Sequence, residues 1–351
     1  MLYIHKTACI SPQQTHPETD LNRLMASKNN MLQITETAYA DIPRGVLRRM
    51  GKAVRMSVGL ALPLLKNGPV PDGIIIGTAN GGIEDCIKFL NQIIEYNEGL
   101  LTPGNFVQST SNAPAAQIAL ITKNRKYNCT HTHRGLAFEN ALLDAIMQLE
   151  ENEENSYLVG SVDEISAYNF NIDRLAGCFR EAVISNNKLF ETSAAGTIAG
   201  EGCLMMTVSG KAAGAVARVV ALQTIHSTDE NLVRNTLEQF LHQTGFSGNA
   251  PDLLISGENG DSRLQKYYDA IESLFPATVS VARFKHLSGE YCTASSFGFW
   301  LATEILQSGK IPDIVLKQDG GREIERILIY NNYRGLQHGM ILLESGEAGE
   351  I

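Results

Sequence analysis

From residue 73 onward, short apolar runs alternate with longer segments in which apolar positions recur at helical spacing. Gly73–Gly77 places three isoleucines between two glycines, which is typical of a buried strand. Glu84–Ile94 follows with the periodicity of an amphipathic helix. This alternation predicts an α/β architecture.

The same two patterns predict the later elements. Helices are expected over residues 113–121, 136–149, 229–244, 264–274 and 293–307. Strands are expected over residues 157–160, 202–208, 215–222, 252–256, 279–282, 327–331 and 340–344. In the helix at 136–149 the larger apolar side chains predict the inward face, namely Leu136, Leu143, Ile146 and Met147.

The order of elements restarts after Gly210. Two successive α/β halves of similar order indicate a pseudo-duplicated fold, with halves at 1–210 and 211–351. No flexible, low-complexity linker separates these halves in the sequence, so we expect them to pack as one unit.

Composition narrows the function classes. The 351 residues carry a formal net charge of −9, and this acidic balance argues against a nucleic-acid surface, which needs a basic footprint. No run of about eighteen apolar residues is present, so no membrane partner is expected. The opening MLYIHKTACI does not resemble a secretory leader, and the six cysteines form no CxxC pair. We therefore expect a cytoplasmic chain without disulfides.

The stretch Asn128–Leu136 is the main candidate for chemistry, because a strand is expected to turn sharply into a helix there. His131 and His133 are two residues apart and share a face if the strand extends that far. Spacing suggests no third ligand beside them, so the sequence predicts no metal site. Gly81–Gly82 lacks the Walker lysine and the dinucleotide glycine spacing, and no cofactor is expected.

Several segments along the chain resemble the β-ketoacyl synthases of the thiolase superfamily in their order and spacing. The segments are Gly77–Asp85, Leu101–Phe106, Ser111–Ala119, Val159–Glu164, Gly200–Gly202 and Phe284–Gly289. The resemblance implies a thiolase-like fold, with two pseudo-duplicated βαβαβαββ halves that give a layered α-β-α-β-α core. It also implies a dimer, with the second and third segments at its interface.

The family's chemistry uses a cysteine at the strand-to-helix turn, two histidines and a lysine. The resemblance brings Thr132 to the cysteine position, and threonine forms no ready thiolate. The first histidine falls at Ser256 or Gly257, and the second falls at Glu290. Lys285 alone remains.

This triple loss resembles the chain-length factors, which are catalytically dead homologues paired with an active synthase. The resemblance then implies a role in fatty-acid, polyketide or aryl-polyene synthesis. The partners would be an active β-ketoacyl synthase subunit in a heterodimer, or a second copy in a homodimer, together with acyl carrier protein. Phe106, Phe138 and Met147 are candidates for an acyl tunnel, but their helical spacing favours ordinary core packing.

Two enzyme alternatives stay open. Cys129 precedes Thr132 by three residues and would serve as the nucleophile of an active 3-oxoacyl-carrier-protein synthase or acyltransferase if the turn were shifted. Alternatively, Thr132 would act with His133 and Glu290 as an acyl-thioester hydrolase. We interpret Cys129 as a small apolar residue at the strand end, and the histidines as polar residues that need partners, for which Glu290 and Lys285 are candidates.

Overall fold

The computed structural model describes residues 1–36, 38–39, 42–244 and 250–346. Within them, eleven strands form one sheet in the order β3-β2-β4-β5-β1-β6-β11-β10-β7-β8-β9. The strands are β1 (Leu2–Ile10), β2 (Gly73–Gly77), β3 (Tyr127–His131), β4 (Ser156–Asp163), β5 (Gly202–Ser209), β6 (Ala217–His226), β7 (Leu253–Ser256), β8 (Ser280–Arg283), β9 (Leu316–Gln318), β10 (Arg326–Tyr333) and β11 (Gln337–Ser345). The α-helices are α1 (Arg44–Leu47), α2 (Lys52–Leu65), α3 (Ile83–Glu95), α4 (Pro103–Gln108), α5 (Ala113–Thr122), α6 (Ala137–Glu151), α7 (Ala167–Leu175), α8 (Glu230–Gln243), α9 (Gln265–Glu272), α10 (Lys285–Ser288) and α11 (Ser295–Ser308).

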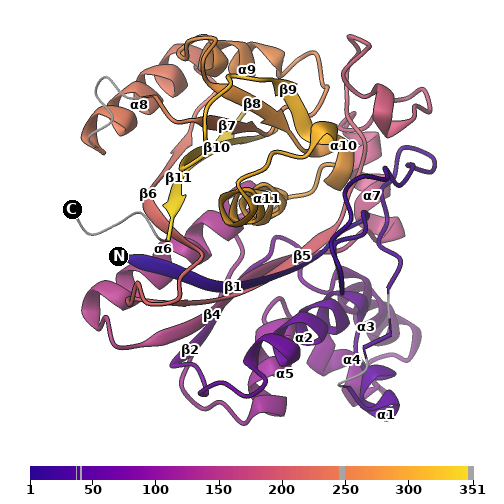
Figure 1. Ribbon diagram of the computed structural model, residues 1–351. Coiled ribbons are helices and arrows are strands. Elements are labelled where there is room, and N and C mark those ends of the chain that lie inside the picture. Colours follow the sequence, from indigo (N-terminus) through magenta and orange to yellow (C-terminus); the bar gives the residue numbers. More distant parts are fainter. Residues whose placement is uncertain (37, 40–41, 245–249, 347–351) are drawn as a thin grey trace.

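The sheet has two parts, β1–β5 and β6–β11, and the helices lie in three layers, one outside each part and one between them (Figure 1). α2 and α5 cover the outer face of the part built from β1–β5, and α8 and α9 cover the part built from β6–β11. α11 contacts strands of both parts and lies between them, and α6 also contacts β1 and β6. The expected layered thiolase-like fold is therefore confirmed. The chain passes from β5 to β6 across residues 210–216, but the division into halves at residue 210 stays a prediction.

Alternation along the buried strands explains how each strand serves two layers. Side chains of successive strand residues point to opposite faces. In β2, Ile74 and Ile76 join the cluster under α2 and α5, whereas Ile75 joins the central cluster. Leu254 of β7 likewise faces the α8–α9 side, and its neighbour Ile255 faces the centre. Because both faces are covered by helices, these strands read as continuous apolar runs.

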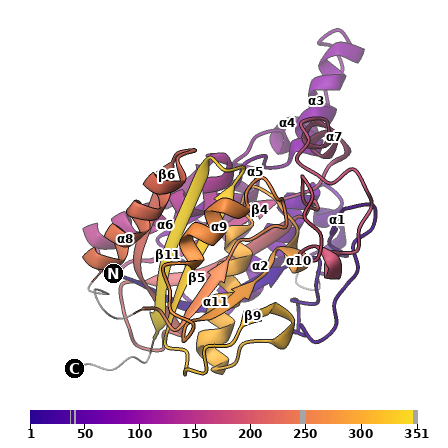
Figure 2. The same ribbon diagram turned by 90° about the horizontal axis from the view of Figure 1, so that it is seen from above.

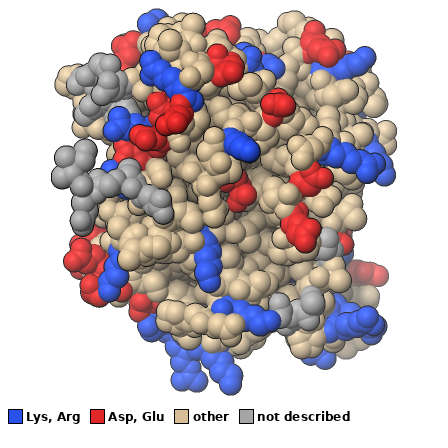
Figure 3. All heavy atoms as spheres, viewed as in Figure 1, with Lys and Arg blue, Asp and Glu red and all other residues tan. Residues whose placement is uncertain are grey.

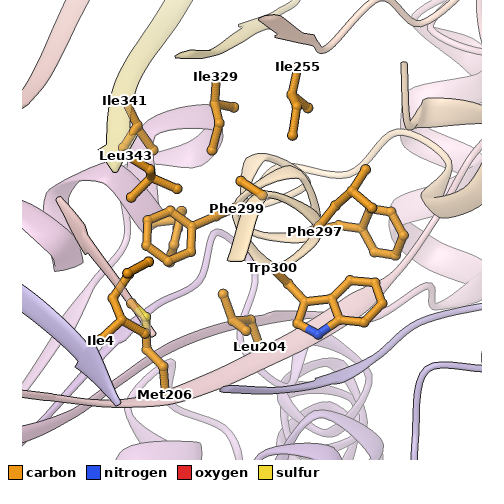
Figure 4. Close-up of a cluster of buried hydrophobic side chains, with 14 of the residues drawn as sticks. Ile4, Leu204, Met206, Ile255, Phe297, Phe299, Trp300, Ile329, Ile341 and Leu343 are labelled. Carbon is orange, nitrogen blue, oxygen red and sulfur yellow. The ribbon is translucent and has the colours of Figure 1, made fainter. Parts of the chain in front are cut away.

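Among the described residues, the largest cluster of buried apolar side chains surrounds the central layer, and Figure 4 shows part of it. Phe297, Phe299 and Trp300 of α11 are at most 2% exposed. They lie between two sets of strand side chains (Figure 4). One set comes from β1 and β5, and the other from β7, β10 and β11: Ile4, Leu204, Met206, Ile255, Ile329, Ile341 and Leu343. Both parts of the sheet thus share one apolar core.

The predicted inward face of α6 was partly wrong. Leu136, just before the helix, is buried, but Leu143 is 42% exposed and Met147 is 55% exposed. The buried face carries small side chains together with larger ones: Phe138, Ala141, Leu142, Ala145 and Leu149. Alanines let this helix approach both parts of the sheet closely. The prediction was wrong because it took the larger apolar side chains as the buried ones. The core-packing interpretation holds for Phe138 and is wrong for Met147 and for Phe106, which is 60% exposed on α4.

The sequence pattern also missed elements before residue 73. β1 pairs antiparallel with both β5 and β6 and so joins the two parts of the sheet. Its mixed polar and apolar residues do not read as a buried strand. α2 was missed too, although eight of its residues are buried.

One end of the molecule projects from this layered body. α3 and α4 extend outward beside α7 (Figure 2). None of the residues Ile83–Glu95 of α3 is buried. Over the remaining surface seen in Figure 3, basic and acidic side chains are interspersed. Among the described residues, no helix is long and apolar enough to cross a membrane.

Candidate functional site

The turn between β3 and α6 is open to solvent. Thr132, His133 and Arg134 follow β3 and are all exposed. Arg134 has a φ of 48°, in the left-handed region that side chains rarely adopt. The chain then makes one 3₁₀ turn, Arg134–Leu136, before α6 begins. The expected sharp turn is present, and its leading side chains are exposed.

Just beyond these residues, the turn packs tightly against the β10–β11 hairpin. The backbone N–H of Gly135 donates to Oε1 of Gln337 at 3.0 Å. A Cβ added to Gly135 would lie 2.2 Å from the Cβ of Tyr333. A glycine is therefore required here, because Tyr333 occupies the space that a side chain would need.

A polar cluster forms where β3 faces α6. Nε2 of His131 lies 2.8 Å from Oδ2 of Asp144 and 3.6 Å from Sγ of Cys129. The Tyr127 hydroxyl donates to both carboxylate oxygens of Asp144, at 3.0 and 3.1 Å. Cys129, His131 and Asp144 offer ligand atoms within 4.8 Å of one another. The sequence spacing missed Asp144, because it lies on the next helix, thirteen residues after His131.

A second polar cluster lies in the interior, at the start of α10. Nζ of Lys285 is 2.6 Å from Oε1 of Glu290, and the Lys285 side chain is fully buried. Asn259 donates its amide to the other oxygen, Oε2 of Glu290, at 2.8 Å. Both oxygens of Glu290 are thus engaged. The partner found for His131 is Asp144, not Glu290 or Lys285.

The loop after β7 turns its residues in different directions. Ser256 is buried and its Oγ accepts the N–H of Glu258 at 3.4 Å. Gly257 donates its N–H to the carbonyl of Tyr330, and an added Cβ would meet Oδ1 of Asn331 at 2.5 Å. Asn259, three residues after Ser256, reaches Glu290 instead. The sequence analysis did not identify Asn259 as a site residue, because side-chain direction after a strand end depends on the loop backbone.

A cavity of about 380 Å³ opens beside this interior cluster. Its volume lies in the range typical of small-molecule sites. Glu290 and Asn259 line it, while Thr132, His133 and Cys129 are not among its described lining residues. The lining also includes apolar and aromatic side chains: Ile165, Phe170, Ala176, Phe179, Tyr291 and Tyr333.

Two thiols face this cavity, and neither is activated. Burial raises the pKa of Cys178, and burial raises the pKa of Cys292 further. Sγ of Cys292 donates to the Tyr333 hydroxyl at 3.2 Å. On the β3 edge, burial raises the pKa of Cys129 and the Asp144 carboxylate adds to this. A thiol with a raised pKa is mostly protonated near neutral pH and is a poor nucleophile.

The carboxylates of the family-like motifs serve as anchors for the backbone. Asp163 accepts from the N–H groups of Ala79 and Asn80 and from Thr293, and thereby ties β4 to the start of α11. Glu164 lines the cavity, and desolvation raises its pKa to about 7. This one motif therefore contributes a backbone anchor through Asp163 and a titratable wall of the cavity through Glu164.

Glu139 is a further buried acid that the sequence analysis did not identify. It lies on α6, is 1% exposed, and within the described residues neither of its side-chain oxygens has a hydrogen-bond partner. Desolvation raises its pKa to about 7. Gly339 of β11 lies beside it, since an added Cβ there would be 2.5 Å from Oε1 of Glu139.

Solved structures share the architecture over nearly the whole chain. A β-ketoacyl synthase from Burkholderia phymatum STM815 matches with a TM-score of 0.78 at 14% identity, covering 98% of this chain and 99% of that one. The chain has a ketosynthase fold. The ishigamide ketosynthase/chain length factor matches with a TM-score of 0.72 at 16% identity, again covering 98% of this chain and 99% of that one.

A third ketosynthase structure and a family profile agree with this fold. The structure is a type II polyketide synthase acyl-carrier protein in complex with its ketosynthase bound to the hexaketide. It matches with a TM-score of 0.76 at 11% identity and covers 98% of this chain and 99% of that one. Residues 23–182 match the profile of the β-ketoacyl synthase N-terminal domain. None of the curated proteins matches the sequence.

Proposed function

We propose that this ketosynthase-like chain is a non-catalytic subunit, a chain-length-factor-type partner of an active β-ketoacyl synthase in fatty-acid, polyketide or aryl-polyene synthesis. One observation carries the proposal. The cavity is lined by a Glu290 carboxylate whose two oxygens are held by Lys285 and Asn259. The residue at the expected nucleophile position, Thr132, is exposed and is not among the described lining residues.

This arrangement is poorly suited to thioester condensation. The reaction needs a nucleophile within reach of an acyl thioester, and hydrogen-bond donors aimed at the developing oxyanion. A hydroxyl without an activating base is a weak nucleophile at neutral pH. An ionised Glu290 only accepts hydrogen bonds, so it offers no donor to a developing enolate or oxyanion.

The two enzyme alternatives receive less support. A synthase or acyltransferase that used Cys129 would need its thiolate, but the pKa of that thiol is raised. A hydrolase that used Thr132 with His133 and Glu290 would need a hydrogen-bonded triad, whereas both oxygens of Glu290 are engaged by Lys285 and Asn259. Neither alternative accounts for the cavity beside Glu290.

A partner subunit is supported by the projecting end of the molecule. Large apolar side chains are exposed on and beside α3, α4 and α7: Leu90, Ile94, Leu100, Phe106, Val107, Ile172 and Leu175. The exposed fraction of Leu100 is 86% and that of Phe106 is 60%. Clustered exposed apolar side chains mark interaction surfaces. We propose that the active synthase covers this end, and that acyl carrier protein serves the assembled pair.

Exposure to acyl- and malonyl-carrier-protein thioesters tests whether the chain is catalytic. Intact-protein mass spectrometry is expected to show no acyl adduct, and the thioesters are expected to hydrolyse at the rate seen without the chain. An adduct that disappears in Cys129→Ala or Thr132→Ala would overturn the proposal in favour of the matching enzyme alternative. An active ketosynthase under the same conditions confirms that the thioesters are competent.

Reconstitution tests the partner role. The tagged chain is expressed in its native host, any ketosynthase that co-purifies is identified, and the pair is rebuilt from purified components. Phe106→Asp is expected to abolish the pair, while Leu232→Asp, an exposed apolar position on α8, leaves it intact. Removing the chain should shift the distribution of product lengths. An unchanged distribution, or an active ketosynthase indifferent to this chain, would overturn the role.

A further inference from the structure

We propose that Cys129, His131 and Asp144 form a binding site for Zn²⁺ beside the edge strand of the sheet. β3 is the edge strand, and residues 129 and 131 project from the same face of it toward α6. Asp144 meets them from that helix. The site is separate from the cavity and does not depend on whether the chain condenses acyl groups.

The distances fit a tetrahedral ion. Zn²⁺ binds sulfur at about 2.3 Å and imidazole nitrogen at about 2.05 Å, so two such ligands on a tetrahedral centre lie about 3.5 Å apart. Sγ of Cys129 and Nε2 of His131 are 3.6 Å apart. Nε2 of His131 and Oδ2 of Asp144 are 2.8 Å apart and would open to about 3.4 Å around the ion.

The donor set selects the metal. Thiolate and imidazole are ligands of Zn²⁺ and related borderline cations, whereas Mg²⁺ and Ca²⁺ prefer oxygen. A Cys129 thiolate, an Asp144 carboxylate and a neutral His131 imidazole together carry two negative charges. Zn²⁺ balances these two charges at a site that is only partly exposed to solvent. A water completes the fourth position.

Burial and outer contacts support a built site. The side chain of His131 is 27% exposed and that of Asp144 is 11% exposed, so the ion has an entry path while the carboxylate is held. The hydroxyl of Tyr127 donates to both oxygens of Asp144 and orients it. Outer partners of this kind orient metal ligands in known sites. The three ligand side chains therefore converge from β3 and α6, and Tyr127 holds Asp144 in place.

The bound ion would pin the end of β3 to α6 beside the Thr132 turn. Without metal, the cluster is a hydrogen-bond network that must keep the Cys129 thiol protonated. With metal, the thiol loses its proton to solvent and a bond from sulfur to Zn²⁺ replaces the S–H bond, with no redox change. We expect the thermal midpoint of the chain to rise on adding Zn²⁺, because the ion binds the folded arrangement and the unfolded chain lacks it.

Metal titration of the whole chain tests the site. The purified chain is stripped with a chelator and reloaded with Zn²⁺ alone, and the retained metal is expected to be one ion per chain. Co²⁺ in place of Zn²⁺ should show the charge-transfer absorption of a thiolate ligand and the visible bands of a tetrahedral centre. Cys129→Ser and Asp144→Asn should lower Zn²⁺ affinity at least about a hundredfold, since loss of an outer partner alone costs about 10–100-fold.

Matched controls separate this site from general binding. His133→Gln, an exposed histidine two residues beyond His131, and Cys86→Ser, a partly exposed cysteine on α3, should bind Zn²⁺ as the parent does. Tyr127→Phe keeps all three ligands and should weaken binding by about tenfold. Circular dichroism checks that each variant is folded. A Co²⁺ spectrum without a thiolate band, or equal affinity in Cys129→Ser and the parent, would overturn the site and leave a hydrogen-bond network only.

Discussion

The two polar clusters at the strand ends of this chain show how burial changes the meaning of similar chemistry. On the β3 edge, the side chains of His131 and Asp144 are partly exposed. In the interior, Lys285 is fully buried and is matched by Glu290, which Asn259 also holds. Each group in the interior cluster depends on its partner, because a buried charge without one is costly. The edge cluster is expected to tolerate the loss of one partner better, because water can reach a partly exposed site and replace the missing group.

Breaking the interior ion pair should have the largest effect on stability. Lys285→Met leaves the Glu290 carboxylate beside the cavity without its cation, which is expected to cost about 3–5 kcal/mol of unfolding free energy. Urea denaturation with the linear extrapolation measures it. Lys285→Met combined with Glu290→Leu should recover more than half of the loss, because similar-sized apolar residues often replace a buried pair at little cost. A double variant as unstable as the single one would show that packing, not charge, sets the effect.

The buried acid on α6 predicts a pH dependence. The pKa of Glu139 is about 7 in the folded chain against an ordinary value of 4.5. The folded chain therefore holds this proton more tightly than the unfolded chain does. The contribution of protonated Glu139 to the free energy of unfolding is fully present below the ordinary pKa and is lost as pH rises through about 7. The shift corresponds to about 3 kcal/mol. The difference in unfolding free energy between Glu139→Gln and the parent should therefore shift in favour of the variant as pH rises. Between about pH 4 and about pH 8 the shift should reach up to this amount.

Chemical denaturation of parent and variant at both pH values measures this difference. Glu164 also has a pKa of about 7, so the parent alone would combine two slopes. The Glu139→Gln variant keeps the pH dependence of unfolding free energy that comes from Glu164 and lacks the part that comes from Glu139. Parallel stability curves for parent and variant across this pH range would contradict the assignment.

The tight turn before α6 should show a smaller effect. Gly135→Ala brings a Cβ against Tyr333 and is expected to cost about 1–3 kcal/mol, typical of overpacking. Gly45→Ala in α1 has no atom within 4 Å of the new Cβ and should be neutral or slightly stabilising. Thermal unfolding of the two variants gives the comparison. Equal midpoints would mean that the β10–β11 hairpin moves aside without cost.

The smallest effect is expected on the edge cluster in metal-free solution. Asp144→Asn removes a charge partner of His131 at a partly exposed site, where such pairs contribute about 1 kcal/mol or less. The loss should be measured in chelator and then again with Zn²⁺. A metal-free loss as large as that of Lys285→Met would abolish the contrast between the two clusters.

Most of the longer strands and helices after residue 73 could be predicted from periodicity, because buried strands and helices impose their own spacing on apolar residues, whereas α7 and the short α4, α10 and β9 were missed. Gly73–Gly77 was predicted with the bounds of β2, and the helix expected at 113–121 is α5 with one more residue. β1 was missed because strands β5 and β6 that pair with it come more than 190 residues later. Its burial is set by those partners and not by its own pattern.

The candidate site divides in the same way. The residues that the family resemblance brings to the catalytic positions, Thr132, Glu290 and the retained Lys285, could be read from the sequence, whereas the ion pair between Lys285 and Glu290 is seen only in the structure. The role of Asn259 depends on the loop path after β7. The approach of Asp144 to His131 depends on how α6 packs on β3. These contacts join separate elements, and the local order of apolar and polar residues does not specify how such elements are placed relative to one another.

The sequence by itself determined the α/β class, the order of most elements and the absence of a cysteine at the expected turn. These properties are local, since they follow from spacing and residue type. Only the tertiary structure decided that Thr132 is exposed, that Glu290 is enclosed by Lys285 and Asn259, and that Cys129, His131 and Asp144 converge at the β3 edge. The reason is physical: burial and side-chain convergence arise from packing between distant segments, and a one-dimensional pattern specifies which faces are apolar but not what covers them.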